Sequence, residues 1–305
     1  MTVSSQPLAG VRGEDFVAPP PTRRRRLLDD LAEIVAELRQ SRDIVHQLTL
    51  RDIRVRYKQA VFGFAWALLL PASVVLAGLA VRLAFAYMSG RQIAINQIAG
   101  MALKAVPWGF FVGCLNATTP SLVANKALVT KIYFPREVLP LGALLAQTFD
   151  SSIALTLVAV VLPFLGVTAS VQILWAPLLL ALLWVFALAA GLFLSCANLF
   201  FRDVKYLVQV FVTFGIFLTP VLLDAAMFGP KGARFMMLNP VGAVLEGLRL
   251  SVVEHHSLLE TVRAPAGFVV WQPAYLLYIA VVAFGGLLVS ALFFHRSERR
   301  FAELV

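Results

Sequence analysis

The feature that most restricts the fold of this chain is a long stretch without charge. No Asp, Glu, Lys or Arg occurs from Ser151 to Phe201. These roughly 51 positions are enough for two membrane crossings of about 20 residues each. The whole chain agrees, because 60% of its 305 residues are hydrophobic and only 14% are charged. Such a chain has more apolar surface than one soluble core buries, so we expect an integral membrane protein.

Apolar runs of sufficient length predict an all-α membrane fold with six transmembrane helices. The predicted spans are residues 61 to 87, 103 to 124, 138 to 165, 173 to 200, 204 to 223 and 265 to 294. The stretch 224 to 264 mixes apolar patches with charges around Gly229-Pro230 and Asn239-Pro240. It is therefore predicted to form two short re-entrant helices. Residues 61 to 305 together make one six-span domain.

The N-terminal part is predicted to contain two regions. Residues 1 to 26, with three consecutive prolines and four consecutive arginines, are expected to be a disordered cytoplasmic tail. Residues 27 to 60 are expected to form amphipathic interface helices on the membrane surface, with Leu27, Leu31, Ile34 and Leu38 on one stripe and acidic residues opposite. Docking of the first helix on a partner protein is the alternative.

Most of the 26 Lys and Arg residues lie in segments that six spans place on the N-terminal side of the membrane. The positive-inside rule then puts both termini in the cytoplasm of a multi-pass inner-membrane protein. The formal net charge of +9 reflects this topology, so no nucleic-acid partner is predicted.

Motifs of catalysis are missing from the sequence. There is no Gly-rich phosphate loop followed by Lys-Ser/Thr, no His-Glu-x-x-His and no Gly-x-Ser-x-Gly elbow. The two cysteines, Cys114 and Cys196, lie in separate apolar segments, and the adjacent His255 and His256 would point about 100° apart on a helix. No catalytic residue and no metal site is predicted.

Four segments taken together resemble the permease subunits of ABC-2 type polysaccharide exporters, which carry O-antigen, teichoic acid, capsule or galactan. They are the stretch 51 to 59 with Phe62, Gly63, Trp66 and Pro71; the stretch 125 to 140; Arg202-Asp203-Val204 with Thr219-Pro220; and Asn239-Pro240 with Arg249. The ending from Phe293 to Glu303 is also similar, although the family pattern has Asp where Glu303 stands. The resemblance extends from about residue 27 to the end of the chain.

The resemblance implies a homodimer that works with two copies of a separate cytoplasmic ABC ATPase. The ATPase would bind ATP and Mg, so this chain needs no cofactor. The transported substrate would be a lipid-linked polysaccharide that crosses the bacterial inner membrane. An ABC-2 permease that exports small hydrophobic molecules or drugs shares the fold and is the alternative.

Two groups of residues are predicted to work at the cytoplasmic face. Coupling to the ATPase is assigned to Lys126, Lys131, Tyr133, Phe134, Pro135, Arg136 and Glu137. Alternatively, the two aromatic residues sit at the headgroup level and Arg136 marks topology. Binding of anionic lipid headgroups is assigned to Arg51, Arg54, Arg56, Tyr57 and Lys58. Plain positive-inside charge explains this second group equally well.

Three further groups are predicted within the membrane. Some of the aromatic residues Trp66, Trp108, Phe110, Phe111, Phe211, Phe214 and Phe217 are expected to line a path for sugars, with core packing or lipid contact as the alternative. An outer gate is assigned to Asn239, Pro240, Glu246 and Arg249, unless the Glu246–Arg249 pair only stabilises its helix. Asp150 is an intramembrane charge with either a functional role or a hydrogen bond to a neighbouring helix. Arg82 and Lys104 are expected to snorkel to the outer interface.

Overall fold

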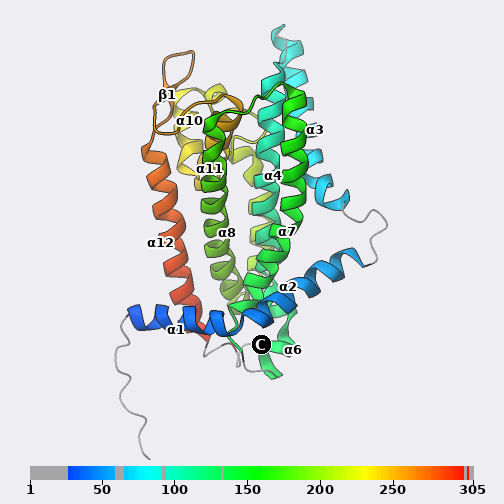
Figure 1. Cartoon of the computed structure of the whole chain (residues 1–305), viewed down its shortest axis with the longest axis vertical. Helices are drawn as coiled ribbons and strands as arrows, with labels where there is room; N and C mark the ends of the chain where they lie inside the picture. The colour runs from blue at the N-terminus through cyan, green and yellow to red at the C-terminus, as the bar shows by residue number, and fades with distance from the viewer. Residues whose placement is uncertain (1–26, 59–64, 91–93, 132–133, 299–300, 302–305) are drawn as a thin grey trace, which may run out of the picture.

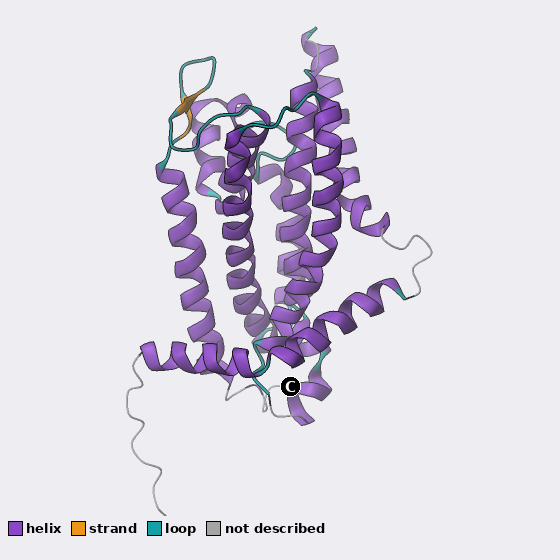
Figure 2. Cartoon of the chain, in the orientation of Figure 1, coloured by secondary structure: helices purple, strands orange, loops and turns teal. Residues whose placement is uncertain are grey.

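A computed structural model describes residues 27–58, 65–90, 94–131, 134–298 and 301 of the chain. The expected N-terminal tail lies outside the described residues. Almost all of the described chain is helical, and one short pair of strands stands at one end of the molecule (Figure 2). The prediction of an all-α membrane fold is confirmed apart from this hairpin.

Five helices of the described chain are long and apolar enough to cross a membrane. They are α3 (Ala65–Ser89), α4 (Ile95–Thr118), α7 (Val138–Val161), α8 (Trp175–Phe200) and α12 (Ala274–Ser297). Each has 24 to 26 residues and is therefore about 36 Å long or more, against a hydrocarbon core of about 30 Å. The helices stand side by side in one bundle (Figure 1).

The predicted fifth span, 204 to 223, is not one long helix. Helix α9 (Val204–Gly215) continues only through the 3-10 turn η3 (Ile216–Leu218), which gives an apolar helix too short to cross by itself. Pro220 follows, and a proline inside a helix removes a backbone hydrogen bond and clashes with the preceding turn. Val221 and Leu222 are buried, so this irregular segment lies against protein.

The predicted sixth span, 265 to 294, begins later than expected. Strands β1 (Val262–Arg263) and β2 (Val269–Trp271) form an antiparallel hairpin first, and α12 starts only at Ala274. Trp271 is fully buried and its indole N–H donates to the Leu258 carbonyl at 3.0 Å. The apolar residues before Ala274 thus cover the end of the bundle and do not extend the helix. The predicted second span also shifts, since α4 begins at Ile95.

Two helical pieces occupy the stretch between η3 and the hairpin. The first joins the 3-10 turn η4 (Ala225–Phe228) to α10 (Gly229–Leu238), and the second joins α11 (Pro240–Leu248) to the π-helical turn η5 (Arg249–Val253). They meet at an angle of 113°. Asn239 makes the bend, because its side chain caps α11 by accepting from the Val241 N–H at 3.1 Å, and Pro240 occupies the first helical position.

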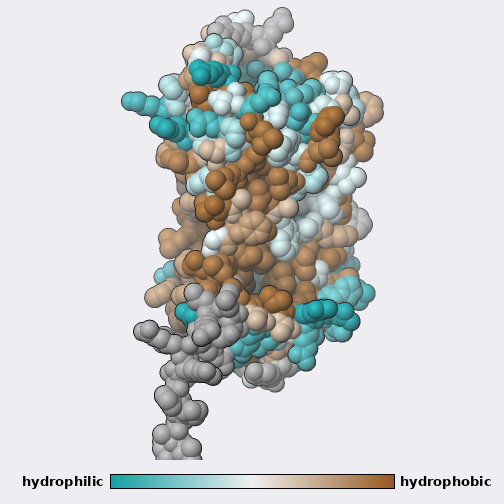
Figure 3. Space-filling model, turned by 60° about the vertical axis from the view of Figure 1, so that its left-hand side comes forward, coloured by the Kyte–Doolittle hydropathy of each residue, from teal (hydrophilic) through white to brown (hydrophobic). Residues whose placement is uncertain are grey.

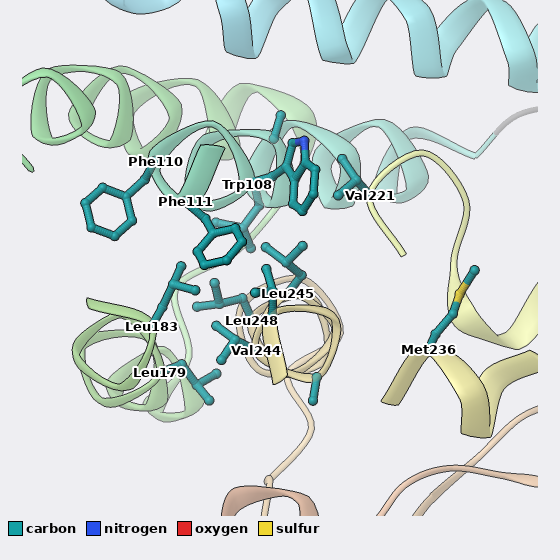
Figure 4. Close-up of a cluster of buried hydrophobic side chains, with 14 of the residues drawn as sticks. Trp108, Phe110, Phe111, Leu179, Leu183, Val221, Met236, Val244, Leu245 and Leu248 are labelled. Carbon is teal, nitrogen blue, oxygen red and sulfur yellow. The ribbon is translucent and has the colours of Figure 1, made fainter. Parts of the chain in front are cut away.

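Helix α4 is the centre of the bundle and packs against α3, α7, α8, α9 and α11. Its Phe111 points toward Leu183 of α8 and Leu245 of α11, and its Trp108 lies on the side of Val221 (Figure 4). Small residues allow close helix contact here: a Cβ atom on Gly191 would lie 2.8 Å from the Thr118 Oγ1 atom. The tip of the bent helix pair is therefore part of the core.

The remaining short elements gather at the two ends of the bundle (Figure 1). The amphipathic end carries α1 (Leu27–Gln40), α2 (Arg42–Tyr57), α5 (Ser121–Ala124), α6 (Lys126–Lys131) and the last turn of α12. The hairpin end carries α10, α11, β1, β2 and the link of 3-10 turns η1 (Leu162–Leu165) and η2 (Val171–Leu174). On the face shown in Figure 3, hydrophobic residues cover the middle of the molecule, and hydrophilic residues gather toward both ends.

The acidic face of α1 does not point away from the protein. Asp30 is buried, and its carboxylate accepts from the Arg296 guanidinium at 3.0 Å, whereas Val35 is exposed. Together with Ile34, which is also buried, Asp30 holds α1 against the end of α12. The expected orientation, with the acidic side opposite the buried stripe, is wrong for this residue because the arginine of another helix compensates its charge.

Candidate functional site

Six charged side chains meet at the hairpin end, beneath the bent helix pair. We call them the buried charge cluster, and its members are Arg82, Lys104, Asp224, Glu246, Arg249 and Glu254. Asp224 is the centre: its carboxylate accepts from Lys104 Nζ at 2.9 Å and from Arg82 Nη2 at 3.0 Å. Arg249 Nε lies 3.6 Å from the same carboxylate. Three acidic and three basic groups therefore balance one another.

The cluster joins parts of the chain that are far apart in sequence. Arg82 comes from α3, Lys104 from α4, Asp224 from the link after α9, and Arg249 from the turn after α11. Lys104 is fully buried and Arg82 is 3% exposed, so the expectation that both snorkel to the outer interface is wrong. A buried charge of this kind persists only where an opposite charge compensates it, and Asp224 does so for both.

The two charged residues assigned to an outer gate, Glu246 and Arg249, pair with each other and belong to this cluster. Arg249 donates to Glu246 Oε1 through Nε at 3.1 Å and through Nη2 at 2.5 Å, and it also pairs with Glu254. Glu246 has no exposed surface, and its second oxygen lies 3.9 Å from Lys104 Nζ. The pair thus does more than stabilise its own helix, because it connects α11 to α4. Asn239 and Pro240 start α11, as described above.

Asp150 is paired with α2. Helix α2 packs against α7, and at its end Tyr57 donates to Asp150 Oδ1 at 2.6 Å while Arg56 forms an ion pair with the other oxygen. Arg56 also donates to Gln147 at 3.1 Å. Burial and the hydrogen bond to Asp150 raise the pKa of Tyr57, so the phenol keeps its proton. Of the group expected at lipid headgroups, Tyr57 is half-buried, and the four basic residues Arg51, Arg54, Arg56 and Lys58 are exposed.

The segment predicted to couple to an ATPase divides into exposed and buried residues. Lys126 is exposed at the start of α6, and Pro135 is half-buried. Phe134 is 8% exposed and packs in the core of the amphipathic end with Val138 and Phe294. Phe134 is therefore a packing residue and not a surface anchor in this chain. Tyr133 and the side chain of Lys131 lie outside the described residues.

Arg136 and Glu137 are also turned toward the protein. The Arg136 guanidinium donates to the Glu298 carbonyl at 2.6 Å and stands 5.9 Å from the centre of the Phe301 ring. Glu137 is 3% exposed. The two residues therefore join the start of α7 to the end of α12.

The aromatic residues predicted to line a path fall into two sets. Trp108, Phe110 and Phe111 on α4 are at most 8% exposed. Phe111 stacks on Phe186 with ring centres 5.8 Å apart, so the α4 set packs the core and the path assignment is wrong for it. The second set, which we call the α9 set, is 61% to 65% exposed and consists of Phe211 and Phe214 on α9 and Phe217 in the adjoining turn η3. The side chain of Trp66 lies outside the described residues.

Sequence reasoning missed Asp224 as the centre of the buried charge cluster. The signal was available: two basic residues in otherwise apolar segments, Arg82 and Lys104, require an opposite charge at the same depth. Asp224 comes directly after an apolar segment and was the missing partner. The hydrophobic periodicity of the sequence places these charged residues in separate segments, and it does not predict which of them form ion pairs.

Comparisons with known proteins agree with the membrane architecture. An O-antigen export system permease protein, RfbA of Klebsiella pneumoniae, is 24% identical over 267 residues, which cover 86% of this chain and 95% of that protein. A second Klebsiella pneumoniae protein of that name is 26% identical and covers 67% of this chain and 77% of the relative. The RfbA protein of Myxococcus xanthus is 26% identical, with 74% and 86% covered.

No protein-family model matches the chain. The similarity to the three permeases nevertheless extends over most of the chain and of each relative. It confirms the predicted resemblance to ABC-2 type polysaccharide exporter permeases.

Proposed function

From the chain's similarity to O-antigen export permeases, we propose that it is the permease subunit of an ATP-driven exporter of a lipid-linked polysaccharide. Two copies of the chain form the transmembrane part, and two copies of a separate ABC ATPase bind at the amphipathic end. The observation that carries the proposal is the similarity over 86% of the chain and 95% of one such relative. The chain itself supplies a conduit and no covalent chemistry.

The exposed face of α9 supports the conduit. Phe211, Phe214 and Phe217 recur at every third position and present flat rings on one side of the helix. Sugar rings stack on flat apolar surfaces, and such contacts are tolerant of sugar identity. A second copy of the chain, placed so that the two α9 helices face each other, would enclose an aromatic path.

The bent helix pair supports a closed outer mouth. Irregular backbone at membrane depth is tolerated only where protein or a water-filled cavity surrounds it, and the buried α11 meets this condition. We assign η4–α10 and α11–η5 as the two arms of a re-entrant helix pair that faces the outside. The buried charge cluster then holds this bent helix pair against α3 and α4 between transport cycles.

Transport in inverted membrane vesicles tests the proposal. Vesicles with the chain, its cognate ATPase and a lipid-linked polysaccharide should accumulate polymer when ATP is added, and vesicles that lack the ATPase should not. A hydrolysis-deficient ATPase is the matched control. Polymer transport or ATP hydrolysis by the highly purified chain alone contradicts the proposal. Transport of a hydrophobic dye without the polymer favours a drug permease.

Cysteine labelling tests the orientation of the hairpin end. In a chain without Cys114 and Cys196, single substitutions Lys231→Cys and His255→Cys should react with an impermeant thiol reagent added outside the cell. Ala243→Cys should be protected, because Ala243 has no exposed surface while Lys231 is exposed. Reaction of the first two only from the cytoplasmic side would invert the proposed topology.

A further inference from the structure

Acidic groups surround one histidine at the amphipathic end, where α7 begins and α12 ends. Glu137 directly precedes α7, His295 lies in the last turn of α12, and Glu298 follows that helix. One possible ligand atom from each of the three lies within 4.8 Å of the others. Helix α1 borders the same place, since Glu33 Oε2 is 3.9 Å from His295 Nε2. Three elements thus contribute charge to one small volume.

Glu137 is the unusual member of this group. It is 3% exposed, and neither of its carboxylate oxygens has a hydrogen-bond partner among the described residues. The Nδ1 atom of His295 has none either, and it stands 3.7 Å from Glu137 Oε1. A buried carboxylate whose oxygens accept no hydrogen bond is costly, and the His295 ring is its ion-pair partner here. These atoms therefore face one another across a gap that a positive charge would fill.

Two arginines of the described residues lie at this place, and each is engaged by another group. Arg136 donates its backbone N–H to Glu298 Oε1 at 3.2 Å and its guanidinium to the Glu298 carbonyl. Arg296 is engaged by Asp30. Both of these arginines therefore have partners other than Glu137, which faces the imidazole of His295.

We propose that Glu137, His295 and Glu298 bind a divalent cation of the zinc class. One imidazole nitrogen with two carboxylate oxygens is a donor set that suits Zn²⁺, which holds such ligands at about 2.0–2.2 Å in tetrahedral geometry. Tetrahedral ligand atoms at that distance lie about 3.4 Å apart. The present separations of up to 4.8 Å therefore close with small side-chain rotations.

The orientation of His295 fits this role. Its Nδ1 faces Glu137 and carries no hydrogen bond, while Nε2 faces the Glu33 carboxylate. A metal-bound histidine characteristically donates its other ring N–H to a carboxylate, which fixes the tautomer. Glu33 is thus the positioning residue, and Arg136 positions Glu298. The bound cation links α7 to α12 whatever the chain transports.

Metal analysis of the full-length chain tests the site. The protein is purified in detergent with a tag that contains no histidine, loaded with Zn²⁺ and dialysed against metal-free buffer. Plasma mass spectrometry should then find about one zinc per chain, and more than tenfold less in Glu137→Gln and His295→Gln. Glu33→Gln should weaken zinc binding about 10- to 100-fold. His46→Gln, at an exposed position of α2, is the matched control and should retain the metal.

Two results overturn the proposal. Equal zinc in the wild-type chain and in His295→Gln means adventitious binding, and no zinc in the wild-type chain means that Glu137 and His295 share only a proton. X-ray absorption at the zinc edge of the wild-type protein needs no variant to fold. It should show nitrogen and oxygen neighbours at about 2.0–2.2 Å, and a sulfur neighbour from Cys196 would also reject the site.

Discussion

Replacing Asp224 with alanine should destabilise the chain by about 3–5 kcal/mol, because it leaves buried cations without their carboxylate. Lys104 is fully buried and Arg82 is 3% exposed, and both donate to Asp224. At about 2–4 °C per kcal/mol, this corresponds to a fall of roughly 10 °C in the unfolding midpoint. The two buried cysteines, Cys114 and Cys196, make a thiol-reactive fluorogenic dye a direct reporter of unfolding.

The control for this change is Asp43→Ala, because that carboxylate is 86% exposed and lies 3.9 Å from an equally exposed arginine. An exposed pair of this kind contributes little, so the midpoint should not move. The double variant Asp224→Ala with Lys104→Met should recover part of the loss, since removal of both partners leaves fewer uncompensated charges. A midpoint for Asp224→Ala equal to that of Asp43→Ala would show that the cluster does not stabilise the fold.

The two sets of aromatic residues should respond oppositely to truncation. Phe214→Ala with Phe217→Ala removes exposed rings, so stability should stay within about 0.5 kcal/mol of wild type. Polymer export should nevertheless fall about tenfold or more, which corresponds to a loss of about 1.4 kcal/mol in contacts with the substrate. Trp108→Ala should instead cost on the order of 3–5 kcal/mol of stability, because the 5% exposed indole fills the core beside α11.

Phe164→Ala is the matched control for the α9 variant, since Phe164 is 85% exposed but lies on η1. Its stability and its export should equal those of wild type. The measurements are the dye-based unfolding midpoint and ATP-dependent polymer uptake into inverted vesicles. Unchanged export in the α9 variant would remove α9 from the proposed path. If chemical cross-linking shows that this variant no longer forms a dimer, then the exposed face of α9 is a contact between two copies of the chain.

Several features of this protein follow from local sequence. The charge-free stretch from Ser151 to Phe201 required a membrane environment, because length and composition alone decide whether a helix can cross lipid. Asn239-Pro240 determined where α11 begins, since a capping side chain and a proline act on their own turn of helix. The four motif segments, taken together, carried the resemblance that the comparisons confirm.

Only the tertiary structure decided which charges are compensated and which rings are buried. Asp224 lies 120 residues from Lys104 and 142 from Arg82 in sequence, so no local pattern pairs them. Phe134 and Trp108 look like a surface anchor and a conduit residue in the sequence, but both are buried once the helices pack together. The reason is physical. The periodicity of a sequence indicates which residues share one face of a helix, but whether that face is buried depends on which other helix packs against it. The free-energy cost of an unpaired charge depends on that burial.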